Sequence, residues 1–174
     1  GTVYLAVADQ HGNMVSFINS LAGYFGSGVV VPGTGIMLHS RGLGFTLEDG
    51  HPNRLAPSKR PLHTIIPAFL TRDGEPLLAF GVMGGAMQPQ GHVQLLLNII
   101  EFGMDLQEAI DAPRFRHLVG RSVAIEGLDP PTARQLEALG HEVVGPEGTT
   151  FGGAQAVLRL PRGWAAGSDP RKDG

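Results

Sequence analysis

Residues 1–20 read GTVYLAVADQHGNMVSFINS, and this stretch decides the fold. The larger apolar side chains at positions 3, 5 and 7 alternate with residues 4, 6 and 8, which is typical of a strand. Residues 9–13 carry turn chemistry, because Gly12 and Asn13 can adopt the positive φ of a tight reversal. A second apolar run follows at 14–18, so the stretch predicts a β-hairpin.

Thr2 stands at the tip of the first predicted strand. A free α-amine titrates near pH 8 and can act as the base for the hydroxyl of its own residue. Thr2 is therefore a candidate nucleophile once its amine is released. The chain opens directly in a strand and without an initiator methionine, so we expect a processed product or a piece of a longer protein.

The composition is that of a folded protein with a core. A chain of 174 residues is long enough for one domain, and we expect residues 1–174 to form a single one. Hydrophobic residues make up 42% and charged residues 17%, which argues against a disordered chain. The formal net charge is −3, so neither nucleic acid nor an anionic membrane is an expected partner.

Cysteine is absent from the sequence, which excludes disulfides, thiolate catalysis and cysteine-ligated metal centres. No apolar run approaches the ~20 residues that a membrane span needs, and no signal peptide is visible. These features leave the compartment open, with the cytoplasm favoured over the periplasm or secretion.

The rest of the chain alternates strand and helix patterns, which predicts an α+β fold with helices covering a sheet. Residues 41–59 are rich in Gly, Pro, Asn and Asp and predict a surface loop. Strands 64–71 and 76–82 are apolar almost throughout, so we expect both of their faces to be covered. Further strands are expected at 122–126, 141–144, 154–160 and 163–167, and helices at 90–102 and 130–139. A third, short helix is expected after Asp105, which forms a capping box with Glu108, and this helix ends before Pro113.

Two ligand hypotheses are weak. The glycine-rich segment 26–33 lacks the lysine and the following helix of a phosphate loop. The seven histidines show no ligand spacing, and we expect most of them on the surface or in loops. No metal or cofactor is therefore expected. The segment Arg114–Arg116 is interpreted either as a solvated rim or as part of an internal ion pair.

Two short motifs have a structural and a functional interpretation. His63 and Thr64 precede a strand, where they are either part of a charged loop or donors that hold a carboxylate. Gly84 and Gly85 separate a strand from a helix. They are either a flexible break or a pair of backbone N–H groups that face a reacting oxygen, with a helix N-terminus behind them.

The chain resembles the small, catalytic subunit of the γ-glutamyltransferase family, which includes the cephalosporin acylases. The resemblance rests on ordered blocks at 2–4, 9–16, 25–30, 32–36, 53–61, 83–85, 109–114 and 167–171. It implies an N-terminal-nucleophile hydrolase fold, an αββα sandwich to which this chain contributes the small-subunit portion. It also implies a precursor that cuts itself before the threonine, and a large subunit as partner in a heterodimer or a dimer of heterodimers.

The resemblance also implies the roles of individual residues. Thr2 attacks a γ-glutamyl amide, Ser20 places a hydroxyl beside it, and Gly84 and Gly85 bind the oxyanion. His63, Thr64 and Arg41 are the expected substrate-binding residues, and the large subunit supplies an arginine to the donor carboxylate. Water, an amino acid or a peptide then resolves the acyl-enzyme.

Three departures from the family pattern affect these expectations. Gly44 stands where the family often has an acidic residue for the donor's α-amine, and Ala22 where it often has an asparagine. These substitutions favour an acylase for glutaryl or similar groups as an alternative. Gly1 precedes the threonine, so either the Gly1–Thr2 bond is the scission point or the chain is an uncleaved, non-catalytic scaffold.

Overall fold

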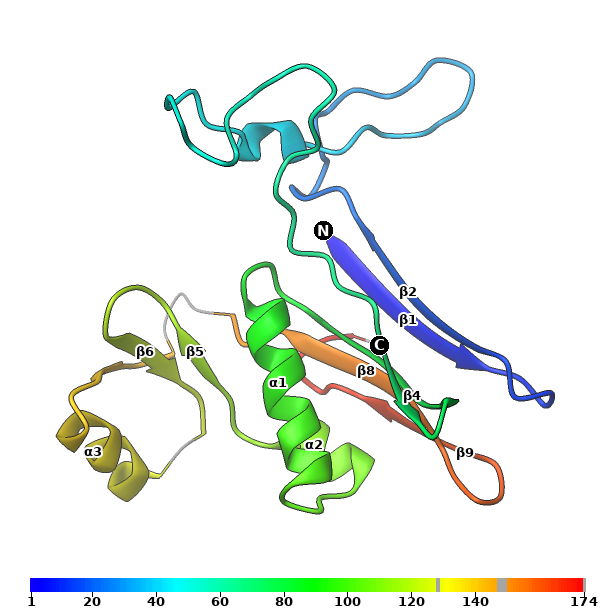
Figure 1. Ribbon diagram of the computed structural model, residues 1–174, viewed down its shortest axis with the longest axis vertical. Coiled ribbons are helices and arrows are strands. Elements are labelled where there is room, and N and C mark those ends of the chain that lie inside the picture. The colour runs from blue at the N-terminus through cyan, green and yellow to red at the C-terminus, as the bar shows by residue number, and fades with distance from the viewer. Residues whose placement is uncertain (128, 147–149, 174) are drawn as a thin grey trace.

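The computed structural model describes residues 1–127, 129–146 and 150–173 (Figure 1). Its elements form two antiparallel sheets that pack face to face, a helical layer on one side, and a small separate sheet. In chain order they are β1 (Thr2–Ala8), β2 (Met14–Ser20), the 3₁₀ helix η1 (Arg41–Gly44), β3 (Ala68–Arg72), β4 (Glu75–Met83), α1 (Met87–Ile100), α2 (Leu106–Asp111), β5 (Phe115–His117), β6 (Ser122–Ile125), α3 (Pro130–Ala138), β7 (Glu142–Val144), β8 (Gly153–Arg159) and β9 (Trp164–Ser168).

Strand β4 lies at the centre of the fold. It pairs with β3 and β8 in a four-stranded sheet of order β3-β4-β8-β9, in which every pairing is antiparallel. The last six residues of β4 are buried, because the strand is covered on both faces. Successive side chains of a strand point to opposite faces, so β4 contributes to two different packing layers.

One face of β4 packs against the helices. Leu78, Phe80 and Val82 belong to the main hydrophobic core, together with Leu95 of α1 and Ile110 of α2. Helix α1 approaches closely because Gly91 faces Val82, where a methyl group on the glycine would lie 2.8 Å from a Val82 carbon. The helical layer is therefore fixed on the sheet by close contact as well as by apolar burial.

The other face of β4 packs against the hairpin of β1 and β2. The ring of Tyr4 lies over Gly81 and occupies the space that a side chain there would need. The Tyr4 hydroxyl is 2.7 Å from the hydroxyl of Ser16 across the hairpin, and burial raises the pKa of Tyr4 to about 12. The predicted hairpin is confirmed, with Thr2 opposite Ser20 and Ala8 opposite Met14.

The outer face of the hairpin is apolar and uncovered. Val3, Leu5, Val7, Val15 and Phe17 all point away from β4, and each is 44–60% exposed. The described residues thus supply three layers of the expected αββα sandwich: α1 with α2, the four-stranded sheet, and the hairpin sheet. The place of the fourth layer is the outer face of the hairpin.

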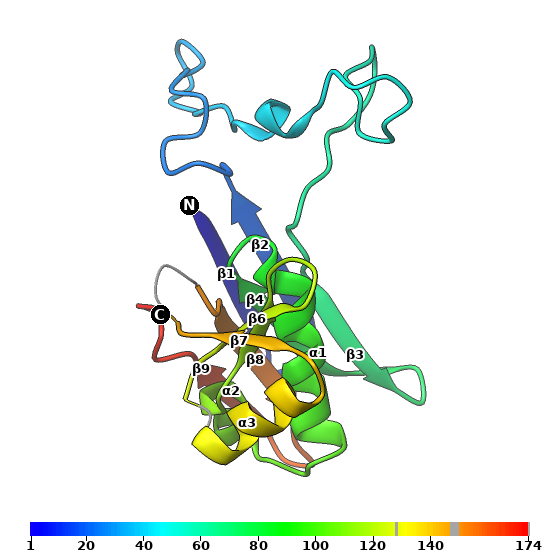
Figure 2. The ribbon, with the colours of Figure 1, turned by 90° about the vertical axis from the view of Figure 1, so that its left-hand side faces the viewer.

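Residues 21–63, called the arm here, extend away from these layers at the top of Figures 1 and 2. Most arm residues are exposed, and two isolated β-bridges within the arm join Val30 to Met37 and Thr46 to Arg54. The arm contains the predicted surface loop 41–59, which includes the short helix η1. Tyr24, Leu43 and Leu62 are 73–89% exposed, so the arm carries apolar side chains without a core of its own.

Most predicted elements are confirmed, with boundary shifts of a few residues. Helix α1 begins at Met87, three residues before the predicted start, and contains Pro89 in its first turn, where a missing N–H costs nothing. The capping box of α2 forms as predicted, with Asp105 and Glu108 each bonding the other's backbone N–H. The unit β6-α3-β7 is a parallel crossover, as its sequence pattern indicates.

Other predictions are wrong. Strand β3 begins at Ala68 instead of residue 64, and Phe69 is 48% exposed, so β3 is not covered on both faces. Ile66 donates its backbone N–H to the side chain of Gln88, so this N–H does not pair with a neighbouring strand of the sheet. Strand β5 was not predicted, since its three residues are too few to show a period. Among the described residues no helix is long and apolar enough to cross a membrane.

Six of the seven histidines are exposed, as expected, and His92 is the exception, because it is a core residue and only 7% exposed. Its Nε2 accepts the backbone N–H of Val82 at 3.1 Å, and its ring lies 4.9 Å from that of Phe80. Burial lowers the pKa of His92 to about 4. The neutral imidazole is thus part of the contact between α1 and β4.

His92 makes stability depend on pH in a defined window. Its folded pKa lies below the unfolded value of about 6.5, so its contribution is complete above pH 6.5 and is lost as the pH falls toward 4. We expect the free energy of unfolding to drop by about 2 kcal/mol more between pH 7 and 4.5 in the native full-length protein than in His92→Gln. Urea unfolding at the two pH values measures this, and equal drops in both proteins contradict it.

Candidate active site

A cleft of about 480 Å³ lies where the start of β1 meets the end of β4. It brings together Thr2, Gly84 and Gly85, which sequence reasoning selected from distant parts of the chain. The arm and the C-terminal segment complete the walls. The residues that line the cleft are Gly1, Thr2, Ala22, Tyr24, Arg41, Thr64, Met83, Gly84, Gly85, Thr150 and Lys172.

The hydroxyl of Thr2 has a defined partner. Thr2 and Ser20 are opposite each other in the hairpin register, so their side chains share one face. The Thr2 Oγ1 and Ser20 Oγ atoms lie 2.8 Å apart, and Ser20 Oγ also accepts the backbone N–H of Ala22 at 3.1 Å. The pairing of β1 with β2 therefore orients the Thr2 hydroxyl.

Gly84 and Gly85 have conformations that favour glycine, and Gly84 also lacks room for a side chain. Their φ angles are +135° and +60°, and a side chain on Gly84 would lie 2.8 Å from the backbone of Gly152. Their carbonyls accept from Met87 and Gln88 in the first turn of α1. Within the described part of the chain their N–H groups donate no hydrogen bond. Two free donors, with the positive end of α1 behind them, favour negative charge in the cleft.

The predicted substrate-binding residues separate into two groups. Arg41, at the start of η1, and Thr64 both line the cleft and are partly buried. His63 is exposed and does not line it, although it is the neighbour of Thr64. Residues 64–66 are held against α1 by the bond from Ile66 N to Gln88 Oε1, at 3.0 Å. Of the two neighbouring residues, Thr64 therefore lines the cleft and His63 does not.

Gly1 is held in place by the irregular segment that follows β2. Its amine donates to the carbonyl of Ala22 at 3.1 Å, and its own carbonyl accepts the N–H of Leu21 at 3.2 Å. Ala22 has φ +68°, a left-handed conformation that costs a non-glycine residue roughly 1 kcal/mol. The turn after Ser20 is thus kept in a strained shape beside the bond between Gly1 and Thr2.

Sequence reasoning missed three residues near the cleft. Lys172 and Thr150 line it, and Gln88 is fully buried behind it. Lys172 follows the segment 167–171 that carries part of the family resemblance, which is a signal that points to this region. Thr150 and Gln88 have no comparable signal, because their roles arise from long-range packing.

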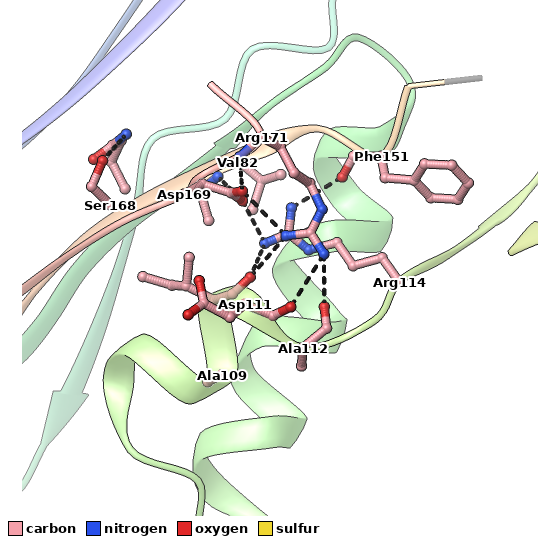
Figure 3. A network of polar contacts seen from close by, with 12 residues as sticks. Val82, Ala109, Asp111, Ala112, Arg114, Phe151, Ser168, Asp169 and Arg171 are labelled. Atoms are coloured by element: carbon pink, nitrogen blue, oxygen red, sulfur yellow. Dashed lines mark hydrogen bonds and ion pairs between the residues drawn. The ribbon is translucent and has the colours of Figure 1, made fainter. Parts of the chain in front are cut away.

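A buried ion network fixes the C-terminal wall of the cleft (Figure 3). Asp169 Oδ2 is 2.8 Å from the Arg114 guanidinium, and both side chains are at most 3% exposed. Asp169 Oδ1 accepts from Arg171 at 3.1 Å, and Arg171 pairs in turn with Glu126 at 2.6 Å. Arg114 is therefore part of an internal ion pair, which was one of its two sequence interpretations.

The network joins the last residues of the chain to the segment before β8. Arg114 donates to the carbonyl of Phe151, and Asp169 accepts the N–H of Ala154 at 2.8 Å. Burial by itself raises the pKa of Asp169. The N–H groups of Ala154 and Arg171 and the two guanidinium charges outweigh burial and hold that pKa below its usual value. The carboxylate is thus ionised and ties Lys172 and Thr150 to the core.

Metal ligation finds no support in the described residues, among which no three His, Asp or Glu side chains form a group that could hold an ion.

Comparison with known proteins identifies what this chain is similar to. The sequence model of the gamma-glutamyltranspeptidase family matches residues 1–174. An oxamate amidohydrolase proenzyme of Klebsiella pneumoniae is 40% identical over 99% of this chain and 34% of its own length. The glutathione hydrolase-like YwrD proenzyme of Bacillus subtilis is 39% identical, over 99% of this chain and 35% of its own length. The chain thus spans about a third of these relatives.

Solved structures show the same fold. A cephalosporin acylase from Bacillus halodurans matches with a TM-score of 0.89 and 50% identity, over 98% of this chain and 32% of that one. The gamma-glutamyltranspeptidase from Pseudomonas nitroreducens complexed with L-DON matches with a TM-score of 0.86 and 30% identity, over 98% of this chain and 96% of that one. These matches confirm the predicted α+β fold of the N-terminal-nucleophile hydrolases.

The buried network makes Asp169 sensitive to a neutral replacement. Asp169→Asn leaves Arg114 buried without its counter-charge, and breaking such a pair costs about 3–5 kcal/mol. Asp49→Asn is the matched control, because Asp49 pairs with Arg54 at the surface, where such a pair contributes at most about 1 kcal/mol. Urea unfolding of the full-length protein measures both. Equal effects of the two substitutions contradict the assignment.

Proposed function

The chain belongs to the gamma-glutamyltranspeptidase family, and from this premise we propose that it is the small, catalytic part of an autoprocessed amidohydrolase or acyltransferase with Thr2 as its nucleophile. The observation that carries the proposal is the Thr2 hydroxyl, which is bonded to Ser20 and lies in one cleft with Gly84 and Gly85. The relatives named above as proenzymes support the processing step.

The proposed reaction uses both polar groups of the terminal threonine. Thr2 Oγ1 attacks the carbonyl carbon of the substrate amide while the freed amine of Thr2 takes the hydroxyl proton. The C–N bond then breaks, the proton passes to the leaving amine, and an ester joins the acyl group to Thr2. Water or an amino acid or peptide amine attacks the ester and restores the hydroxyl. Ser20 keeps Oγ1 in position throughout.

Gly84 and Gly85 are proposed to stabilise the tetrahedral intermediate. Their N–H groups have no other partner in the described chain, and α1 begins directly behind them. Donors already oriented toward the developing charge contribute roughly 3 kcal/mol each in comparable sites. A side chain on either glycine would disturb this arrangement, because both have φ in the positive range.

The bond between Gly1 and Thr2 is the proposed scission point of the precursor. In the self-cleavage step, Thr2 Oγ1 attacks the Gly1 carbonyl carbon, an ester replaces the peptide bond, and water hydrolyses the ester. The Gly1 carbonyl accepts the N–H of Leu21, which stabilises the charge that develops on its oxygen. The Ala22 carbonyl, in the strained turn, accepts a hydrogen bond from the backbone nitrogen of Gly1 at the same time. The same hydroxyl therefore serves in processing and in turnover.

The donor in this proposal is a γ-glutamyl amide such as a glutathione-like peptide. The second candidate, an acylase for glutaryl or similar groups, is favoured by Ala22. This residue lines the cleft and offers no polar side chain to a donor amine. Gly44, the other departure from the family pattern, does not line the cleft and brings no carboxylate to it.

We propose that the remainder of the precursor packs on the outer face of the hairpin, so that the two matured parts form a heterodimer. Five large apolar side chains on that face are about half exposed, and the hairpin sheet contains only β1 and β2 within the described residues. A face of this kind in a soluble protein marks an interaction site. Helices packed on it would complete the αββα sandwich, and further strands would extend its second sheet.

Thr2 is required for both steps in this proposal. Thr2→Ala leaves the full-length precursor uncut and without hydrolysis of γ-glutamyl and glutaryl p-nitroanilides, whereas Thr2→Ser retains both reactions at a lower rate. Mass spectrometry is expected to show a small chain that begins at residue 2 in the native protein and in the control Thr34→Ala, which alters a surface turn. A Thr2→Ala protein that matures and turns over substrate refutes the assignment.

The outer hairpin face is required for assembly. Leu5→Lys puts a charge into the contact with the rest of the precursor, and we expect the two matured parts to copurify at least about tenfold less well. Val119→Lys is the control, since Val119 is 76% exposed in the turn before β6 and outside this face. Capture through a tag on the large part, followed by densitometry, gives the ratio. Unchanged copurification of Leu5→Lys rejects the face as the interface.

A further inference from the structure

We propose that Ser40 is a positioning residue for self-cleavage, because its side chain holds the turn that donates a hydrogen bond to the carbonyl of the scissile bond. The inference rests on the proposed function, in which the bond between Gly1 and Thr2 is cut. It adds a residue of the arm that was not selected from the sequence. Ser40 acts on the reacting groups through the turn that follows β2.

The Ser40 hydroxyl is bonded on both sides to this turn. It donates to the carbonyl of Leu21 at 3.3 Å and accepts the backbone N–H of Gly23 at 3.1 Å. The backbone N–H of Ser40 donates to the same Leu21 carbonyl at 2.9 Å. Ser40 therefore spans the strained residue Ala22, because it bonds the carbonyl before it and the N–H after it.

Ser40 does not serve as an ordinary helix cap. It directly precedes η1, where a serine side chain usually accepts an N–H group of the helix that follows. In the described chain its hydroxyl makes no such bond to η1 and is bonded to the turn instead. The bond that Ser40 does make to η1 uses its backbone carbonyl, which accepts from Leu43 at 3.1 Å. Removal of the hydroxyl thus acts on the turn and leaves this bond in place.

The turn contacts both groups that react in self-cleavage. The Leu21 N–H donates to the Gly1 carbonyl at 3.2 Å, and the Ala22 N–H donates to Ser20 Oγ, which lies 2.8 Å from the hydroxyl of the nucleophile. The Leu21 carbonyl and the Ala22 N–H belong to one peptide group, so Ser40 bonds this group at one end and Ser20 at the other. Hydrogen bonds in such a chain strengthen one another.

The arm brings Ser40 to the turn by folding back on itself. The N–H of Ser27 donates to the Leu38 carbonyl at 2.9 Å, and the N–H of Leu38 donates to the Val29 carbonyl at 2.9 Å. These bonds pair the returning part of the arm with its outgoing part, and Ser40 forms the last contact at the base. Self-cleavage in this proposal therefore depends on a folded arm.

The role of Ser40 is confined to the cut. The Gly1 carbonyl is a reacting group only in the precursor, because cleavage separates it from Thr2. In turnover the oxyanion is bound by the glycine pair at the end of β4, which has no described hydrogen bond to Ser40. The contact between Thr2 and Ser20 is set by the register of the hairpin. Loss of the Ser40 hydroxyl is thus expected to slow cleavage and to spare turnover.

Pulse-labelled cell-free translation of the full-length precursor, followed by gel densitometry, gives the half-time of cleavage. We expect Ser40→Ala to lengthen it at least about fivefold, and Ser40→Thr, which keeps a hydroxyl, to stay within about twofold of the native half-time. Ser27→Ala is the matched control, because exposed Ser27 makes the same pair of contacts elsewhere in the arm, to the Leu38 carbonyl at 2.9 Å and the Val29 N–H at 3.3 Å. A native half-time in Ser40→Ala overturns the proposal.

Turnover of the matured protein distinguishes positioning from a general loss of structure. After prolonged incubation, kcat on γ-glutamyl and glutaryl p-nitroanilides is measured per small chain counted by mass spectrometry. Ser40→Ala is expected to change this kcat by less than about twofold. A loss in kcat as large as the loss in cleavage rate means that the whole site is disturbed, and it overturns the assignment.

Thr2→Ala in the same cleavage assay separates this inference from the proposed function. An uncut Thr2→Ala precursor, together with equal half-times for Ser40→Ala and the native protein, refutes the role of Ser40 and retains the function. A Thr2→Ala precursor that is cut, together with slow cleavage of Ser40→Ala, refutes the proposed nucleophile and retains Ser40 as the residue that positions the scissile carbonyl.

Discussion

The contact between the Tyr4 ring and the backbone of Gly81 is the constraint on which the site depends. Tyr4 lies two residues after Thr2, and Gly81 lies three residues before Gly84. Because Gly81 has no side chain, the ring can lie directly on β4 and fix the separation of the two strands. The hydroxyl of Thr2 and the glycine pair are thereby brought to one cleft from segments about 80 residues apart. The Ser16 hydroxyl, 2.7 Å from that of Tyr4, also donates to the Phe80 carbonyl at 3.4 Å and so ties the hairpin to β4.

The cleft has walls of different physical character. The hairpin and β4 supply a rigid wall, held by strand pairing and by the core on the helical face. The C-terminal wall is held by a charged network, in which Asp169 satisfies two guanidinium groups and two backbone N–H groups. Such a network is costly to bury and fixes a particular geometry only when every member is bonded. The backbone N–H of Lys172 is bonded to the Asp169 carbonyl at 3.1 Å, so the network places Lys172 at the wall of the cleft.

Sequence reasoning succeeded where a pattern is local and failed where contacts are remote. Local sequence patterns, namely short apolar periods and turn or capping residues, predict the hairpin, the capping box at Asp105 and the crossover β6-α3-β7. Thr2, Ser20 and the glycine pair were found because a family resemblance linked separate blocks. The burial of His92 and the position of Lys172 depend on packing between distant segments, and no local pattern encodes them. His63 and Thr64 show this limit, because they are neighbours in an extended segment and only Thr64 lines the cleft.

Arg41 lines the cleft from a segment that has no core of its own. Arg41 belongs to the arm, whose apolar side chains have little to pack against within the described chain, and the arm leaves the body next to the uncovered hairpin. Thr2, by contrast, is positioned by the register of β1 with β2, which places its hydroxyl beside that of Ser20. The hairpin therefore orients the candidate nucleophile through its own strand pairing, whereas the position of Arg41 depends on what packs against the arm.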